Sequence, residues 1–383
     1  MKYINRYIIL AMAAAALLIT ATEAHGSDDT YRREADSFLS DMPAKLQENQ
    51  AGAIRMAIAG DTEPLDGVRN SRNSIPQLPA GIRRMNVGGN LALFRDTRYD
   101  NDTIPLLIYF HGGGWTIGSI NSCSRFCAAM AGNGIAVLAV DYRLAPEHGY
   151  PEGLDDCMAA VDTAAANLDR WKCSSISLGG DSSGGNLAIA TAMSFPRDTF
   201  KSMVAFYPVT KAYADNSSSW KEFGDGFGLD SGLMEAFNEA YTSDIHNPLV
   251  SPAEASDDVL KTLPPTLMVA ADRDILRDQG ADFADRLRRL GNKVEYRLVP
   301  GSVHLFITVP GQAAAFGYAV SEASAFIHAC HNRSGAGGGV RLCRVGGFRF
   351  HPRLRCQSGF SSSSRSRFMK AFQIAPNGMR MQF

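Results

Sequence analysis

Residues 176–186 read Ile-Ser-Leu-Gly-Gly-Asp-Ser-Ser-Gly-Gly-Asn, a short apolar run that passes through glycines and serines into the helix-like stretch 184–193. A nucleophilic serine needs such a turn between a strand and a helix, because the turn exposes its oxygen and flanking glycines leave room for it. Ser182, at the centre of residues 180–184, is therefore predicted to be a nucleophile. In a chain with 36 glycines, a glycine-rich turn that only lets a helix pack on a strand is the alternative.

The chain around this stretch alternates short apolar runs with helix-like segments. The apolar runs are 106–110, 135–140, 176–178, 203–207, 266–270 and 294–299, and the helix-like segments are 121–131, 153–168, 184–193, 280–290 and 313–329. This alternation predicts an α/β fold with a mostly parallel central sheet and helices on both faces. Right-handed crossovers place the carboxyl ends of the strands at one edge, so we expect the chemistry in the loops there.

The chain outside this alternation predicts a cap and an insertion. Residues 25–100 are polar, contain two possible amphipathic helices, and are interpreted as an N-terminal cap region before a catalytic domain at 101–330. Residues 211–262 interrupt the alternation and include the helix-like stretch 231–241. They are expected to form an insertion over the functional edge, with 211–245 contributing to the cap.

Residues 1–24 have the pattern of a secretory signal peptide. Lys2 and Arg6 precede an apolar run at 7–21, and small residues follow it, so cleavage is expected near Ala24. An uncleaved anchor is the alternative, although the run is short for a bilayer that needs about 20 apolar residues. The mature protein is therefore expected to be exported, periplasmic or secreted, with no stable membrane span.

Residues 331–383 carry ten Lys or Arg and no acid, and they are predicted to be a basic, disordered tail. A polyanion-binding arm and a non-native extension are the alternatives. The residues before the tail contain 28 basic and 39 acidic side chains. Because this body is acidic, no nucleic-acid partner is expected. The seven cysteines have no zinc-site spacing, and no metal site is expected.

A second motif, His111-Gly112-Gly113-Gly114-Trp115, directly follows the apolar run at 106–110. Three successive glycines leave backbone N–H groups unshielded. Together with the N–H of the residue after the serine, they are expected to bind the negative charge that develops on a carbonyl oxygen during acyl transfer. A flexible loop with a structural His111 is the alternative for this motif taken alone.

A serine nucleophile also needs a general base, and His304 is the candidate among eight histidines. It lies in Pro-Gly-Ser-Val-His-Leu-Phe at 300–306, after the last predicted strand and before the last predicted helix, which is the expected edge. His148 and His246 are less favoured, because they precede or interrupt the functional side of the fold.

The acid that orients the histidine is expected after the apolar run at 266–270, where residues 271–278 contain several aspartates. Either Asp272 or Asp274 fits the position. A solvated helix-capping turn is the alternative, and a metal site is a weaker one. The order serine, aspartate, histidine along the chain is typical of α/β hydrolases.

Several motifs together give the chain its resemblance to a known family. They are His111 to Trp115, Asp-Tyr-Arg-Leu-Ala-Pro-Glu at 141–147, Gly-Asp-Ser-Ser-Gly-Gly-Asn at 180–186, Asp-Ile-Leu-Arg-Asp at 274–278, and His-Leu-Phe at 304–306. Over about 105–330 the chain resembles the hormone-sensitive-lipase-like, or family IV, bacterial esterases. The resemblance implies an α/β-hydrolase fold with a helical cap.

The resemblance also implies roles for single residues. Ser182 would attack the substrate, His304 would move the proton, and Asp274, rather than Asp272, would orient His304. Three backbone amides would hold the oxyanion: those of Gly113, Gly114 and Ser183. The family usually has alanine where Ser183 stands and proline where Ile275 stands, and neither change removes a catalytic group.

The expected function is a serine carboxylesterase that hydrolyses short-chain acyl esters through an acyl-enzyme intermediate. Its partner would be a small-molecule ester, and no cofactor is implied because all reacting groups belong to the protein. A long-chain lipase and a serine amidase or peptidase are the enzymatic alternatives. A catalytically silent ligand-binding receptor is the non-enzymatic alternative, since plant hormone receptors resemble the same group.

Overall fold

A computed structural model describes residues 29–332, so the predicted signal peptide and residues 333–383 of the predicted tail lie outside the described residues. One eight-stranded sheet forms the centre of the fold, in the order β1-β2-β4-β3-β5-β6-β7-β8. Its strands are β1 (Ile82–Gly88), β2 (Leu91–Asp96), β3 (Ile104–Phe110), β4 (Ala136–Val140), β5 (Cys173–Asp181), β6 (Met203–Phe206), β7 (Thr266–Arg273) and β8 (Val294–Val303). Strands β3 to β8 run parallel, which confirms the predicted α/β class.

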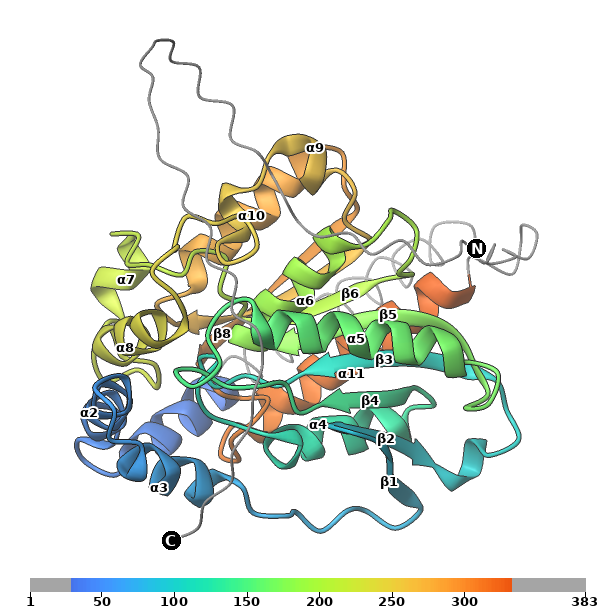
Figure 1. Ribbon diagram of the computed structural model, residues 1–383, viewed down its shortest axis with the longest axis horizontal. Coiled ribbons are helices and arrows are strands. Elements are labelled where there is room, and N and C mark those ends of the chain that lie inside the picture. Colours follow the sequence, from blue (N-terminus) through green and yellow to red (C-terminus); the bar gives the residue numbers. More distant parts are fainter. Residues whose placement is uncertain (1–28, 333–383) are drawn as a thin grey trace, which may run out of the picture. The chain divides into compact units, whose positions relative to one another are not determined.

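Helices cover both faces of the sheet (Figure 1). α4 (Ile120–Gly132) and α11 (Ala313–Asn332) pack on one face, and α5 (Glu152–Asn167), α6 (Ser183–Ser194) and α10 (Arg277–Arg289) pack on the other. These five helices coincide with the five helix-like segments predicted from the sequence. Side chains of β3 alternate between the two resulting cores: Leu106, Ile108 and Phe110 face one, and Leu107 and Tyr109 face the other. This two-sided burial explains why the strand is apolar without interruption.

Two strands were not predicted. β1 and β2 pair with each other and, through β2, with β4, and both pairings are antiparallel. The sheet therefore begins at Ile82, inside the range interpreted from the sequence as the N-terminal cap. β1 lies at the edge of the sheet and is half exposed, and β2 carries the buried polar residues Arg95 and Asp96. Neither strand shows a continuous apolar run like those of β3, β4 and β6.

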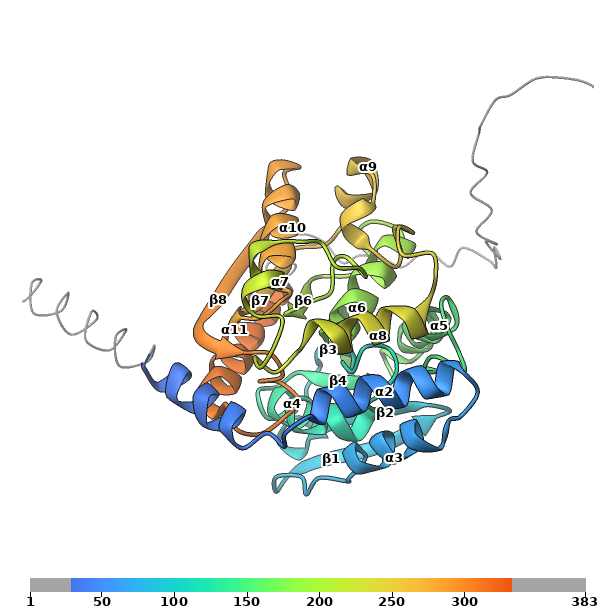
Figure 2. The ribbon, with the colours of Figure 1, turned by 90° about the vertical axis from the view of Figure 1, so that its left-hand side faces the viewer.

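Several of the remaining helices lie near the carboxyl ends of the parallel strands. Before β1 these are a helix over residues 29–40, α2 (Leu46–Ile58) and α3 (Glu63–Arg72). The predicted insertion contains α7 (Ser218–Glu222), α8 (Ser231–Tyr241), the short 3-10 helix η2 (Pro252–Glu254) and α9 (Asp257–Leu260); a second 3-10 helix, η1 (Thr97–Tyr99), follows β2. α2 lies beside α8, so these two distant segments form one layer (Figure 2).

The order of the strands brings two of the predicted motifs together. β3 pairs with β4 on one side and with β5 on the other, so the chain winds in opposite directions from this point. Loops that leave neighbouring strands at such a switch point open a crevice between them. The triple-glycine motif follows β3, and Ser182 follows β5, so the fold places both at this crevice.

Candidate active site

Ser182 occupies a strained turn between β5 and α6. Its backbone φ of 55° and ψ of −121° lie in a region that side chains rarely adopt. Two of the flanking glycines are required by close packing, because a Cβ on Gly180 would lie 2.2 Å from the carbonyl oxygen of Gly184, and one on Gly184 would lie 2.0 Å from that of Phe110. The turn therefore presents the Ser182 hydroxyl at the edge of the sheet, as a nucleophile elbow requires.

The structure brings together the three side chains predicted to act on the substrate. His304 Nε2 lies 3.1 Å from Ser182 Oγ, and His304 Nδ1 lies 2.6 Å from Asp274 Oδ2. His304 and Asp274 are each only 1% exposed. A buried carboxylate at Nδ1 keeps the proton on that nitrogen, which leaves Nε2 free to accept the serine proton. Tyr207 packs its ring 4.3 Å from the His304 ring and holds its plane.

The two candidate acids have different surroundings. The second oxygen of Asp274 accepts a hydrogen bond from the backbone N–H of Leu276, which fixes the carboxylate toward His304. Asp272 instead accepts the backbone N–H of Gly301, three residues before the histidine. Asp278 accepts the N–H of Ser219 and so ties the insertion to α10. Of the three aspartates, Asp274 is the one in contact with His304.

The triple-glycine loop after β3 lies against the same cavity. Gly113 and Gly114 have φ values of 121° and 59°, and a Cβ on Gly114 would lie 2.0 Å from the Phe237 ring. The Gly113 carbonyl accepts the N–H of Ile117, which closes the loop. Neither the N–H of Gly113 nor that of Gly114 donates to another of the described residues. Both donors are therefore available to a ligand beside Ser182.

The other histidines named in the sequence analysis lie elsewhere. His111 is buried and stacks on Tyr142 with ring centroids 4.3 Å apart, and burial lowers its pKa. His148 contacts Glu152, and His246 lies near Glu254. None of the three has a hydrogen bond to Ser182 or His304 among the described contacts. His111 Nδ1 instead lies 2.9 Å from the carbonyl oxygen of Gly112, within the glycine loop.

Two supporting residues escaped the sequence analysis. Gln312 donates to the carbonyl oxygens of Val303 and His304 and accepts the N–H of Val303, so it holds the histidine loop from both sides. Asp181 accepts the N–H of Gly112 and the hydroxyl of Tyr109. Asp181 is part of the motif at 180–186, so its position could have been noticed from the sequence. Gln312 lies outside every motif, and nothing in the sequence pointed to its role.

The cavity at Ser182 is small. It holds about 40 Å³ and is bounded by the glycine loop, by α2 and by α8, with apolar walls that include Leu46, Leu233 and Phe237. A site for one water needs about 10–15 Å³ by the same measure, so only a few heavy atoms fit.

Neither a metal site nor a membrane helix is found in the part of the chain that the structure describes. Residues 29–332 contain no group of three or more His, Cys, Asp or Glu side chains that could hold a metal ion. No helix in the same range is both long and apolar enough to cross a membrane.

With this geometry in view, comparisons with known proteins identify the family. Residues 107–308 match a family described as having the alpha/beta hydrolase fold. That match covers more than half of the chain and contains both glycine motifs, Ser182, Asp274 and His304. The chain belongs to the α/β-hydrolase family. The group that it matches is the hormone-sensitive-lipase-like one, as its motifs indicated.

Curated relatives of this hydrolase include esterases and a lipase. It is 34% identical over 243 residues to the carboxylesterase NlhH of Mycobacterium tuberculosis, a match that covers 60% of this chain and 76% of that protein. It is 36% identical over 217 residues to an arylesterase of Saccharolobus solfataricus, covering 54% and 69% of the two chains. It is 35% identical over 240 residues to lipase 2 of a Moraxella species, covering 53% and 54%. The hydrolase thus spans about half to three quarters of the length of these relatives.

Solved esterase structures share the fold of the hydrolase. A variant of the esterase rPPE aligns with a TM-score of 0.66 at 25% identity and covers 79% of this chain and 96% of that chain. A thermostable esterase from Pseudomonas putida aligns with a TM-score of 0.63 at 27% identity and covers 77% and 94%. The protein is thus a carboxylesterase-type α/β hydrolase.

Asp181 provides a pH-dependent prediction for this hydrolase. Burial raises the pKa of the carboxyl group from 3.8 to about 6. The folded protein therefore binds this proton more tightly than the unfolded chain, and the free energy of unfolding falls as the pH rises from 4 toward 7. Asp181→Asn removes this loss and keeps an oxygen that can accept from Tyr109 and Gly112. Relative to the variant, the wild type should lose about 2 kcal/mol over that range.

Urea unfolding of both proteins at several pH values measures this difference. A constant difference between pH 4 and pH 7 would show that the buried carboxyl group does not titrate as stated. Asp181→Ala is the matched control for positioning, because it also removes the acceptor for Gly112. It should lower the rate of ester cleavage more than Asp181→Asn does.

Proposed function

We propose that this hydrolase is a serine carboxylesterase that cleaves short-chain acyl esters through an acyl-enzyme intermediate. The observation that carries the proposal is the continuous contact from Asp274 through His304 to Ser182, at 2.6 Å and 3.1 Å. Such a chain of contacts activates a serine hydroxyl for acyl transfer. Gly113 and Gly114 line the same cavity, and their N–H groups have no partner among the described residues, which supports the oxyanion role.

In the proposed reaction, Ser182 Oγ attacks the carbonyl carbon while His304 Nε2 takes the hydroxyl proton. The N–H groups of Gly113, Gly114 and Ser183 bind the developing oxyanion. The tetrahedral intermediate then collapses, and the alcohol leaves with the proton from His304. Water attacks the acyl-enzyme with His304 again acting as base, and the carboxylic acid is released.

The expected kinetic sign of this mechanism is a burst. Mixing the protein with excess 4-nitrophenyl acetate should release about one equivalent of 4-nitrophenolate per active site before the steady state. Hydrolysis of 4-nitroanilides faster than of the matching esters would favour an amidase instead. A protein that binds small ligands but cleaves no ester in a broad panel would favour a receptor.

The small cavity favours short acyl chains over a long-chain lipase. We propose that the helical part of the N-terminal region, residues 29–72, acts together with residues 211–245 as a cap, because α2 and α8 both line this cavity, whereas β1 and β2 belong to the sheet. Across 4-nitrophenyl esters, kcat/KM is expected to be highest for acetate or butyrate. An optimum at about ten carbons or more would reverse this assignment.

Phe237 should set the chain-length limit. It is 4% exposed, lies directly over Gly114, and closes the cavity from the side of α8. Phe237→Ala is therefore expected to raise the ratio of kcat/KM for octanoate over acetate at least roughly tenfold, because several methylene groups gain space. Phe223→Ala removes a buried ring of the same insertion that does not line the cavity, and it should leave the ratio unchanged. A similar ratio in the wild type and both variants would contradict the role of Phe237.

We also propose that the protein is exported and that residues 1–24 are removed. The support is the charged start, apolar run and small residues of this segment. Mass spectrometry of the N-terminus, after expression in a bacterium with a secretory pathway, should find a mature chain that begins at about His25. A retained residue 1 in the extracted protein would contradict export by this route.

A further inference from the structure

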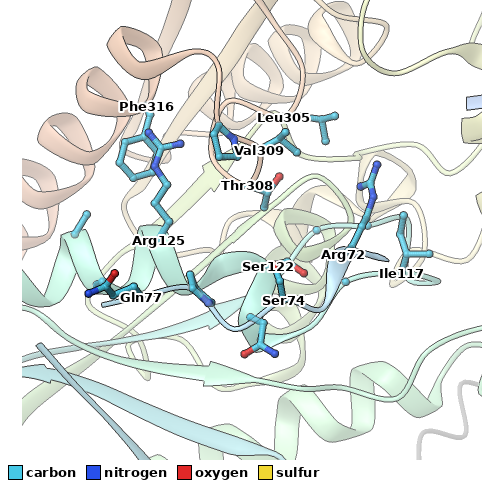
Figure 3. Close-up of a pocket in the computed structure, with 18 of the residues that line it drawn as sticks. Arg72, Ser74, Gln77, Ile117, Ser122, Arg125, Leu305, Thr308, Val309 and Phe316 are labelled. Carbon is cyan, nitrogen blue, oxygen red and sulfur yellow. The ribbon is translucent and has the colours of Figure 1, made fainter. Parts of the chain in front are cut away.

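A second, much larger pocket adjoins the cavity at Ser182. It holds about 700 Å³, a volume in the range of pockets that bind small molecules. Figure 3 shows it between the segment that follows α3, the first turns of α4 and the loop after His304. The pocket and the cavity share Arg72, Gly113, Ile117 and Leu305. A substrate whose ester group lies at Ser182 can therefore extend into this pocket.

Arg125 forms one wall of the pocket. Its guanidinium lies over the Phe316 ring, 3.6 Å from the ring centroid, and Figure 3 shows the two side chains against each other. Its Nη1 is buried without a hydrogen-bond partner, and no carboxylate among the described residues pairs with it. Burial lowers its pKa, with no nearby acid to oppose the effect. The stacking fixes the side chain and leaves its donors unused.

Arg72 stands where the pocket meets the cavity. It ends α3, and it has no hydrogen bond or ion pair with any of the described residues. Burial lowers its pKa, and again no acid opposes the effect. One turn earlier, Arg69 is satisfied by Asp66 and Glu147. The same helix thus carries one paired arginine and one unpaired arginine, and only the unpaired one faces the pocket.

Partial burial of an unpaired guanidinium is unfavourable. The group stays charged, and its five N–H donors lose hydrogen bonds to water without gaining partners in the protein. The surrounding protein is acidic, so carboxylates are plentiful elsewhere on the chain. Two such groups in one ligand-sized pocket beside a nucleophile are explained by a ligand that supplies the missing negative charge. Planar carboxylates and phosphates match the donors of arginine.

We propose that the ester cleaved by this hydrolase carries an anionic group, a carboxylate or a phosphate, on its alcohol portion, and that Arg72 and Arg125 bind it. The short acyl group lies in the small cavity, which is too confined for more. The alcohol portion lies in the large pocket, and the product that leaves is an anionic alcohol. This inference rests on the proposed esterase function.

Matched pairs of acetate esters test it. The first arm compares ω-acetoxy carboxylates of two to six carbons with the corresponding ω-acetoxy amides. The second compares ω-acetoxyalkyl phosphates with the monoacetates of the uncharged diols. Because the acetyl group is common to all, a ratio of kcat/KM reports only the remote charge. At least one length should favour the anion roughly tenfold to a hundredfold, the range of one or two charge-assisted hydrogen bonds.

The arm with the larger ratio identifies the anion. Arg72→Gln and Arg125→Gln should each lower the best ratio several-fold, and the ratio does not depend on how much of a variant folds. Arg55→Gln is the matched control, because Arg55 pairs with Glu239 outside the pocket and its loss should leave the ratio unchanged.

Two results would overturn the inference. One is a ratio below tenfold at every length in both arms, and the other is a high ratio that neither pocket variant lowers. Cleavage of the uncharged acetates separates the two proposals. If they are cleaved and the ratios stay low, the esterase function stands and only the anionic substrate is lost. If no ester is cleaved, the esterase proposal itself fails.

Discussion

Replacing Ser182 with alanine is expected to lower kcat for 4-nitrophenyl acetate by about a millionfold and to abolish the burst, because no other group can carry the acyl intermediate. The hydroxyl is the one group of the strained turn that reaches His304. Stopped-flow absorbance at a known enzyme concentration, with the substrate in excess, measures the burst and the steady rate together.

Ser194→Ala provides the matched control. It removes a serine hydroxyl from the other end of α6. That hydroxyl donates a hydrogen bond to the backbone carbonyl of Ala190 within the same helix. It should leave both the burst and the steady rate unchanged. A Ser182→Ala protein that still formed stoichiometric 4-nitrophenolate in the first turnover would rule out the proposed mechanism.

The second large effect is expected from Asp274→Asn, which should lower kcat by about ten-thousandfold. The amide would present an N–H donor to His304 Nδ1, and this favours the tautomer in which Nε2 carries the proton and cannot accept the one from Ser182. The shape of the site hardly changes, so folding should be preserved. Steady-state kinetics on acetate esters, with thermal unfolding as the check on folding, measure the loss.

Asp272→Asn is a matched control two residues away. Its side chain accepts the N–H of Gly301, and the oxygen of an asparagine can still do so. The expected loss is therefore at most about tenfold, the value of one weakened hydrogen bond. If Asp272→Asn proved the more damaging of the two, the assignment of the orienting acid would have to be reversed.

Most of the fold could be predicted because most of the central strands have a recognisable apolar sequence pattern. β3, β4, β6 and most of β7 are buried on both faces, and such strands read as unbroken apolar runs. β1 and β2 could not be predicted in this way. β1 is a half-exposed edge strand, and β2 ends in the buried polar residues Arg95 and Asp96. Arg95, for example, is satisfied by the backbone carbonyls of Tyr99, Asp102 and Trp171, contacts that no local pattern reveals.

The candidate site was predictable to the same limited degree. Ser182 and the triple-glycine loop could be identified from the sequence because tight turns of this kind need glycines, and those glycines lie next to the functional residues along the chain. The acid stayed open between Asp272 and Asp274 on the residues alone, and only the family resemblance favoured one. Gln312 and Phe237 carried no signal, because what they do depends on segments that meet only in the folded chain.

The sequence by itself determined the α/β alternation, the strained serine turn and the pool of candidate groups, since these depend on periodicity and on sterics over a few residues. The tertiary structure decided which groups meet. Ser182, Asp274 and His304 leave three different strands, and their distances follow from the register of the sheet and the packing of its loops. The same holds for the small cavity under Phe237 and for the pocket between Arg72 and Arg125. Their walls come from distant segments, and local sequence patterns constrain only neighbours along the chain.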